Sequence, residues 1–420
     1  MNDGSAISNG IKLGHLVLES DTWIHRKVER LEIVATGECV HRVSVDFTLP
    51  QRWALKGSKG AALVPVGAMR KGPLRAFTAR GPSDKAVPIL ETGANGEHSV
   101  AMLVALAENA SPAADKLEAF RAVATEAVFH AGTPDAALMR RIEATVRELE
   151  PDPRHAEHLT QLVQQMQTTF LMIVEIDENI VGRRAIVKFE YREPTREDLF
   201  KESAPEIEWV FVDFGLAAST HYEFSPPPLL LVADAELAQT AVYGGGASPI
   251  ARETGDVATT HFVGRPVHRF ATATLRVRLI PRRYGAYSAM YFSAWTVAVV
   301  ILGGVAIRAA RDHHLLPQSP LGASLPPMVL AAGGLLLTWI ARAPEDWITA
   351  RNLWKARRVL LLLAALLVLT AGYLAVPLGE PWRTVGWVTL AGLALALAIY
   401  TTYRRMSDDR CTLGPRASER

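Results

Sequence analysis

The sequence predicts a mixed fold: β-rich, sandwich-like cytosolic units with a helical insert, followed by an α-helical block of four transmembrane spans. Three observations predict it. Apolar residues gather after Tyr287, whereas most charged residues lie before it. Short runs in which apolar and polar residues alternate recur in the first part, which is the period of half-buried strands. Between these runs, residues 100–167 carry apolar residues at helical spacing.

Four apolar windows approach or exceed the length needed to cross about 30 Å of hydrocarbon. They contain no Asp, Glu, Lys, Arg or His, and a buried helix of a soluble domain seldom stays free of charge over such a length. The windows are residues 289–307, 325–341, 359–378 and 384–403. Ion-coupled transport and intramembrane catalysis generally need ionisable groups at depth, so the windows argue against both activities.

Basic residues are distributed unevenly around the four windows. Arg and Lys are dense before the first window, between the second and third, and after the fourth, but sparse in the other two connections. Because positively charged loops stay on the cytoplasmic side, we expect a multi-pass protein of the cell membrane with both termini cytoplasmic. Residues 1–20 contain Asp3 and no continuous apolar core, so we expect no secretory signal there.

Aromatic and basic residues flank the first and third windows. Indole rings favour the headgroup level, and Arg and Lys are attracted to anionic lipids. The candidate membrane-interface residues are Arg282, Arg283, Trp347, Arg351, Trp354, Lys355, Arg357 and Arg358. For the segment 344–358, specific recognition of anionic lipid and an ordinary basic cytoplasmic loop remain two open interpretations.

The β-rich part lies on both sides of the helical segment. Residues 23–50 alternate as two antiparallel strands with a turn near Thr36-Gly37. Thr133-Pro134-Asp135 and Pro151-Asp152-Pro153 are typical helix starts. Further strands are expected at 62–66, 74–78, 87–91, 170–176, 183–193, 207–214, 219–227, 229–234 and 271–283. The expected divisions are a β-rich unit at 1–98, a helical segment at 99–167, a second β-rich unit at 168–283, the four spans at 288–405 and a tail at 406–420.

Three short patterns carry a resemblance. They are Trp23, Arg26, Val28 and Arg30; Arg42, Ser44, Asp46, Phe47, Leu49 and Pro50; and His221-Tyr222-Glu223-Phe224 followed by Pro226-Pro227. Together with the Arg-rich strand before the first window, they resemble uncharacterised actinobacterial multi-pass membrane proteins with a β-rich cytosolic region. The resemblance implies this layout for most of the chain, and it implies no activity and no catalytic residue.

Some residue groups have the types that metal and phosphate sites use, but each has a simpler explanation. The spacing of His155 and His158 suits a metal, and a solvated helix start explains it as well. His313-His314 falls in a short loop expected to be external. Gly244-Gly245-Gly246 lacks the Lys and the Ser or Thr of a phosphate loop, so we expect a linker there.

Carboxylates and cysteines give no stronger signal for catalysis. Asp46 and Asp213 each stand in a Val-Asp-Phe tripeptide, and a catalytic pair would need its carboxyl groups roughly 5–10 Å apart. Capping at strand ends is the simpler interpretation. Cys39 has no evident His partner, and the second cysteine, Cys411, stands far along the chain, which excludes a disulfide framework. We therefore expect no catalytic residue, no metal and no cofactor.

The charge balance and the size of the β-rich part narrow the function. Lys and Arg number 45 against 43 Asp and Glu, which argues against a nucleic-acid partner. We expect a non-enzymatic, membrane-anchored cytosolic sensor or scaffold that binds a protein or small ligand and couples it to the membrane helices. The alternative is a pore-forming or membrane-disrupting effector of the bacterial-defence type. The expected partners are the lipid bilayer and either a partner protein or further copies in a homo-oligomer.

Overall fold

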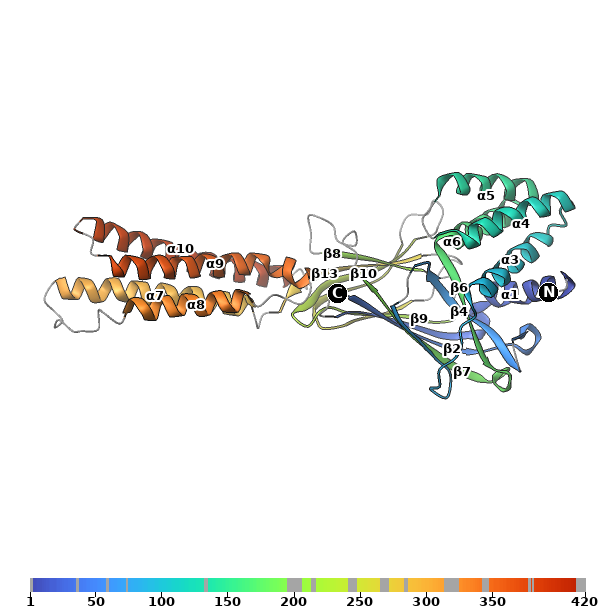
Figure 1. The fold of residues 1–420 in the computed structure, drawn as a ribbon, viewed down its shortest axis with the longest axis horizontal. Helices are drawn as coiled ribbons and strands as arrows, with labels where there is room; N and C mark the ends of the chain where they lie inside the picture. The colour runs from blue at the N-terminus through green and yellow to red at the C-terminus, as the bar shows by residue number, and fades with distance from the viewer. Residues whose placement is uncertain are drawn as a thin grey trace, which may run out of the picture.

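The computed structural model describes residues 3–34, 38–57, 60–72, 75–131, 135–194, 206–212, 217–240, 248–264, 272–282, 286–312, 325–341, 347–376, 379 and 381–412. Figure 1 shows an elongated molecule in which the helices of the carboxy-terminal part form one end. The sheets form the middle, and a second group of helices lies at the opposite end. We call the part before residue 283 the amino-terminal region and the four helices after it the bundle.

Three sheets make up the amino-terminal region. Their strands are β1 (Ile24–Ile33), β2 (Glu38–Thr48), β3 (Leu55–Lys56), β4 (Ala61–Arg70), β5 (Arg75–Arg80), β6 (Thr169–Asp177), β7 (Arg184–Pro194), β8 (Glu206–Val212), β9 (Thr220–Ser225), β10 (Leu230–Thr240), β11 (Ser248–Val257), β12 (Thr260–Gly264) and β13 (Thr272–Pro281). Sheet A has the order β12-β9-β1-β2-β7-β5, sheet B has β3-β4-β6, and sheet C has β11-β10-β13-β8. Only β1 and β9 pair in parallel among the described strands.

Sheet A mixes strands from both predicted β-rich units. β1, β2 and β5 come from the first unit, and β7, β9 and β12 come from the second. Because β1 pairs with β2 on one side and with β9 on the other, the chain returns to the first strands after the helical segment. The two units therefore do not form separate sheets, and the residue limits of the domains stay a prediction.

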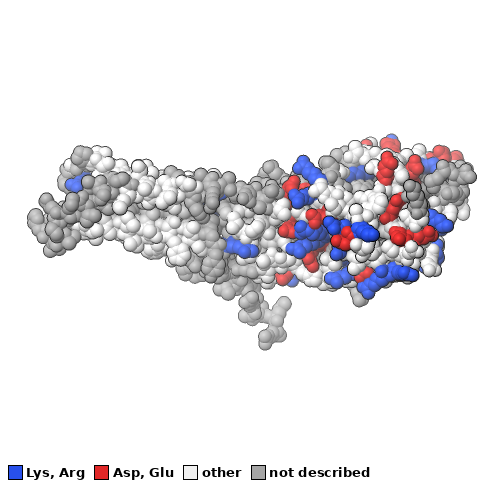
Figure 2. Space-filling view, turned by 60° about the horizontal axis from the view of Figure 1, so that its bottom comes forward, with Lys and Arg blue, Asp and Glu red and all other residues white. Residues whose placement is uncertain are grey.

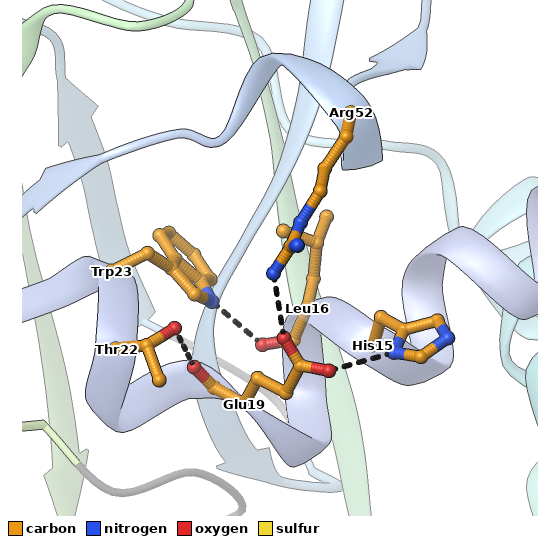
Figure 3. A network of polar contacts seen from close by, with 6 residues as sticks. All are labelled: His15, Leu16, Glu19, Thr22, Trp23 and Arg52. Carbon is orange, nitrogen blue, oxygen red and sulfur yellow. Dashed lines mark hydrogen bonds and ion pairs between the residues drawn. The ribbon is translucent and has the colours of Figure 1, made fainter.

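A helix that the sequence did not predict opens the described chain. Helix α1 (Asp3–Leu18) packs Leu13 and Leu16 into the apolar core, and the short helix α2 (Ser20–Trp23) turns the chain into β1. In Figure 3 the Trp23 indole N–H donates to the Leu16 carbonyl oxygen at 2.8 Å, and Glu19 contacts both His15 and Arg52. The hydrogen bond with His15 lowers the pKa of Glu19. These contacts hold the end of α1 to α2 and to the turn that contains Arg52.

Four helices form the layer at the far end of the sheets. They are α3 (Thr92–Glu108), α4 (Ala114–Phe129), α5 (Ala136–Leu149) and α6 (Pro153–Thr168). Both predicted helix starts are confirmed. The Asp135 carboxylate accepts the N–H of Ala137, and the Asp152 carboxylate accepts the N–H of Arg154, with Pro153 in the first turn.

Two separate apolar cores lie against sheet A. The first lies between sheets A and B and the helices α1 and α3–α6, with Phe47 and Phe120 fully buried. The second lies between sheets A and C and holds Leu31, Phe211 and Phe224. The strands of sheet A are long enough to contribute to both cores, so the sheet joins the two halves of the amino-terminal region.

Buried polar residues of β1 and β2 lie between the two cores, next to Tyr191 at the edge of the first core, and we call Lys27, Glu29, His41 and Tyr191 the polar seam. Lys27 Nζ lies 3.1 Å from Glu29 Oε2, and both side chains are at most 10% exposed. The His41 ring stacks on Tyr191 at 4.4 Å and lies 5.0 Å from the Trp209 ring. Burial lowers the pKa of His41 to about 3, with the charge of Arg70 as a smaller cause, so this ring is neutral at pH 7.

The bundle consists of α7 (Ala286–Asp312), α8 (Leu325–Ala341), α9 (Trp347–Ala375) and α10 (Trp382–Thr412). Three of its helices are long and apolar enough to cross a membrane, whereas α8 has 17 residues and is shorter. Helix α9 contacts the other three, and α8 packs mainly on α9. Figure 2 shows Lys, Arg, Asp and Glu gathered on the amino-terminal region, while the described bundle surface is almost free of them.

The structure differs from the sequence predictions at several elements. The segment 344–358, expected as a loop, is helical from Trp347, so α9 begins 12 residues before the predicted window. The expected strand at 87–91 is wrong, because only Ile89 forms an isolated bridge there, with Val174. β11 and β12 were not predicted. The turn expected at Thr36-Gly37 lies outside the described residues, although its two strands do pair antiparallel.

Candidate functional site at the base of the bundle

Two connections join the amino-terminal region to the bundle, and both involve the second core or sheet C. The first is covalent: β13 ends at Pro281 and α7 begins at Ala286. The backbone N–H of Arg282 donates to the carbonyl oxygen of Leu229 at 3.0 Å, which holds the chain to the sheet up to this residue. About 14 Å of extended chain at most separates the strand from the helix.

The second connection is made by side chains at the start of α9. Ile348 is 0% exposed and is part of the second core, together with Leu230 and Leu279. Thr349 beside it is 1% exposed. Burial of an isoleucine side chain stabilises by roughly 1.5–3 kcal/mol. The first turn of α9 is therefore fixed to the sheets as well as to the other helices.

The same turns of α9 carry a basic and aromatic stripe, formed by Arg351, Trp354, Lys355 and Arg358. Their spacing of three and four residues places them on one side of the helix. All four are exposed, and the Arg358 guanidinium lies over the Trp354 ring at 4.7 Å. A half-exposed indole beside cations suits the boundary between hydrocarbon and anionic headgroups.

The structure places most predicted interface residues on or near this stripe. Arg357 is half-buried on a neighbouring face of α9, and Arg282 is exposed at the end of β13. Trp347 is the first residue of α9, and its side chain lies outside the described part. Arg283 falls in the undescribed residues 283–285. Contact of these residues with lipid stays a prediction.

The interior of the bundle is apolar. Gly304 lies against Trp387, since a Cβ added there would lie 3.4 Å from the ring, and Gly333 similarly lies 3.5 Å from Leu367. The buried hydroxyl of Thr370 donates to the carbonyl oxygen of Leu366 in its own helix at 2.7 Å. Among the side chains that the structure describes, no ionisable group is buried between these helices. The basic and aromatic stripe at the base is therefore taken as the candidate site of the bundle.

The residues considered for reactive chemistry do not come together. Asp46 accepts two hydrogen bonds from Arg184 on the neighbouring strand, which lower its pKa. His155 lies 3.6 Å from Asp152 at the start of α6, and no described group of three or more His, Cys, Asp or Glu can hold a metal ion. Cys39 is buried in the second core. His313-His314, Asp213 and Gly244-Gly245-Gly246 lie outside the described residues.

Sequence reasoning missed the contact of Ile348 and the polar seam. A signal for the seam exists in β1, where Lys27 and Glu29 share the parity of Leu31 and Ile33 and so must face the core. Ile348 gave no such signal, because it stands between two apolar windows in a segment whose composition is that of a loop. His221 and His261 were also missed as a pair; their rings lie 3.1 Å apart between nitrogens on the exposed face of sheet A.

The comparisons with known proteins add no identity to this geometry. No protein-family model matches the chain, and no curated protein matches it in sequence.

Proposed function

We propose that the chain crosses the cell membrane four times and keeps both termini and the whole amino-terminal region in the cytosol. The side of the membrane on which α7 and α9 begin supports this. α7 begins where β13 ends, and α9 begins with Ile348 inside the second core, so both helices start on the same side. Between them the chain must cross back, and α8 is the described helix in that interval. At 17 residues it is about 26 Å long, which suffices with slight thinning of the bilayer.

The distribution of positive charge agrees with this orientation. The stripe on α9 and Arg282 lie at the end of the bundle that meets the sheets, which is the cytosolic end in the proposal. A fusion reporter after Arg420 should then be cytoplasmic, and one inserted at Gln318 should be external. A cytoplasmic reporter at Gln318 would exclude four spans.

We infer that the protein is a non-enzymatic sensor or scaffold whose amino-terminal region is coupled to the membrane helices. The single observation that carries this is the burial of Ile348 in the core of the sheets. A simple anchor needs one tether, whereas this chain has a short covalent junction at 282–286 and a second attachment at α9. A change of packing in the second core therefore acts on α9, which contacts every other helix of the bundle.

A second candidate, a pore-forming effector, is favoured by glycines on the outer surface of the bundle. Gly334 and Gly392 are exposed, and a Cβ added at either would meet no atom within 4 Å. Small residues on a lipid-facing surface allow close approach of further helices. A large assembly that conducts ions across a planar bilayer would support the effector, and a constant small assembly without conductance would support the scaffold.

The coupling can be tested by spin-label distances between Ile186 on sheet A and Val385 near the far end of α10, both exposed. We expect a narrow distance distribution for the parent and for a variant with about ten flexible residues inserted after Gly285, because Ile348 still holds α9. The insertion combined with Ile348→Ala should broaden the distribution. If the insertion alone broadens it fully, the second attachment has no mechanical role.

A further inference from the structure

A cavity of about 460 Å³ lies between the start of α3, the end of α4 and strand β6. Its position is in the first core, on the side of the amino-terminal region that Figure 1 shows away from the bundle. Small-molecule sites in proteins have volumes of roughly 300–1,000 Å³ and mostly apolar walls with a few polar groups. The volume of this cavity lies within that range.

The walls are mainly apolar and aromatic. Phe77, Phe129, Phe170, Met166 and Met172 line the space from four different elements. Methionine side chains adapt to irregular shapes, and Phe rings give a large contact area. Acidic side chains are missing from the described lining, and Lys71 is the one Lys or Arg in it.

Lys71 is already occupied by protein atoms. Its Nζ donates to the carbonyl oxygens of Ala127, Val128 and His130, at 3.1, 2.6 and 3.1 Å, and so caps the end of α4. An ammonium has three N–H donors, and all are used. Burial also lowers the pKa of Lys71 to about 8. An anionic ligand would therefore find no free cation here, and the carboxyl end of α4 would repel it.

Two polar groups in the lining lack a hydrogen-bond partner. Asn95 is 4% exposed; its amide N–H donates to Leu171, while its Oδ1 has no donor among the described atoms. His130 Nδ1 is likewise buried without a partner. An unpaired buried acceptor is unfavourable because it has lost its water without gaining a donor, and a ligand that donates a hydrogen bond to Asn95 removes this cost.

Phe129 lies at the rim of the cavity, and its side chain is unusually exposed. Its side chain is 49% exposed although it ends α4 beside the cavity. Its ring lies against the backbone of Gly96, where an added Cβ would come within 2.4 Å of a ring carbon. Glycine at position 96 therefore allows the ring to lie over the start of α3, and a ligand in the cavity would cover the exposed part of the ring.

We propose that this cavity binds a neutral, mainly apolar small molecule that carries a hydrogen-bond donor for Asn95. Only the role of this molecule as the sensed signal rests on the proposed function. Its binding to the cavity does not depend on the connection between the sheets and the bundle. The cavity belongs to the first core and Ile348 to the second, so the two proposals fail separately.

The test uses the full chain in nanodiscs and the probe N-phenyl-1-naphthylamine, which is neutral, aromatic and has one N–H. Empty nanodiscs of the same lipid give the background. We expect saturable fluorescence with one site per chain, at least tenfold tighter than for 8-anilinonaphthalene-1-sulfonate, the anionic analogue with the same rings. The N-methylated probe, which has no donor, should bind at least fivefold more weakly, and Asn95→Leu should abolish that difference.

Phe129→Ala and Gly96→Ala test the position of the site without filling the core. Both should weaken the neutral probe at least fivefold, because the first removes the aromatic wall and the second displaces it. Val263→Ala, on an exposed side chain of β12 (53% exposed), is the matched control and should change nothing. Absence of a saturable component above empty nanodiscs, equal affinity in all variants, or tighter binding of the anionic probe would each overturn the inference. Loss of probe binding on Ile348→Ala would instead contradict the independence of the two sites.

Discussion

The two halves of the amino-terminal region share one sheet but are covered differently. The half distant from the bundle is covered by sheet B and by α1 and α3–α6, and it contains the cavity. Among the described residues, the half near the bundle is covered by sheet C and takes Ile348 of α9 into its core. The first half therefore leaves an open space in its core, and the second shares its core with the bundle.

The polar seam lies between these halves and keeps the two cores distinct. In a continuous apolar core, sheets B and C could shift along sheet A as long as apolar surface stayed buried, because the hydrophobic effect is not directional. A buried ion pair such as Lys27 and Glu29 disfavours arrangements that separate the two charges. We therefore expect the seam to favour one register of the two halves on sheet A and to contribute little net stability.

The largest expected effect comes from removing one member of the buried ion pair. Lys27→Met leaves the Glu29 carboxylate buried beside an apolar group, which costs about 3–5 kcal/mol. Hydrogen exchange of β1 and β2 amides would measure this as faster opening. The double variant Lys27→Met/Glu29→Leu should recover most of the loss. If Lys27→Met alone exchanges like the parent, the pair is not buried as described.

The lowered pKa of His41 in the polar seam predicts that the unfolding free energy depends on pH. The unfolded chain takes up a proton at this ring near pH 6.5, whereas the folded chain does so only near 3. The unfolding free energy should therefore be highest above about pH 6.5 and fall by about 1.4 kcal/mol per pH unit as the pH decreases through this window. His41→Phe keeps the stacking on Tyr191 and should remove that part of the slope, measured by urea unfolding between pH 4 and 7. An identical slope in both proteins would exclude His41 as its source.

Packing changes inside the bundle should alter the stability of the bundle without affecting either half of the amino-terminal region. In α10, a Cβ added at Gly386 would come within 2.4 Å of the Tyr373 ring of α9. Overpacking of this kind costs about 1–3 kcal/mol, so Gly386→Ala should lower the thermal stability of the bundle. Gly392→Ala meets open space and should be neutral or slightly stabilising. Hydrogen exchange in sheet A should be unchanged in both variants, and a change there would mean that the halves are less separable than described.

The smallest expected effect concerns lipid at the base of the bundle. Each cation of the stripe should contribute roughly 1 kcal/mol to attraction of anionic lipid. Arg358→Gln should therefore reduce the anionic lipid that co-purifies with the protein about fivefold, as counted by mass spectrometry of extracted lipid. Arg383, exposed at the other end of the bundle, provides the control. Equal losses for Arg358→Gln and Arg383→Gln would remove the stripe as a specific site.

The sequence predicted the positions of strands and helices better than it predicted which of them pack or pair with one another. Alternation located most strands, and Asp135 and Asp152 marked two helix starts, because these signals depend on neighbours in the chain. The pairing of β1 with β9 depends on contacts nearly 200 residues apart, and no local pattern encodes it. The start of α9 was missed for a related reason: Trp354, Lys355 and Arg358 give the segment the composition of a basic loop, and the burial of Ile348 before them depends on residues distant in the chain.

The most direct test of the coupling is hydrogen exchange in β13 of the full chain after Ile348→Ala. A buried isoleucine truncated to alanine costs about 2–5 kcal/mol, which corresponds to at least a tenfold change in the opening of the elements it joins. Leu362→Ala, on an exposed residue of the same helix (56% exposed), is the control. Exchange in residues 272–281 should rise at least tenfold for Ile348→Ala and stay unchanged for Leu362→Ala. Unchanged exchange in β13 for Ile348→Ala would show that α9 is not part of the second core and that the bundle is joined to the sheets by the covalent connection alone.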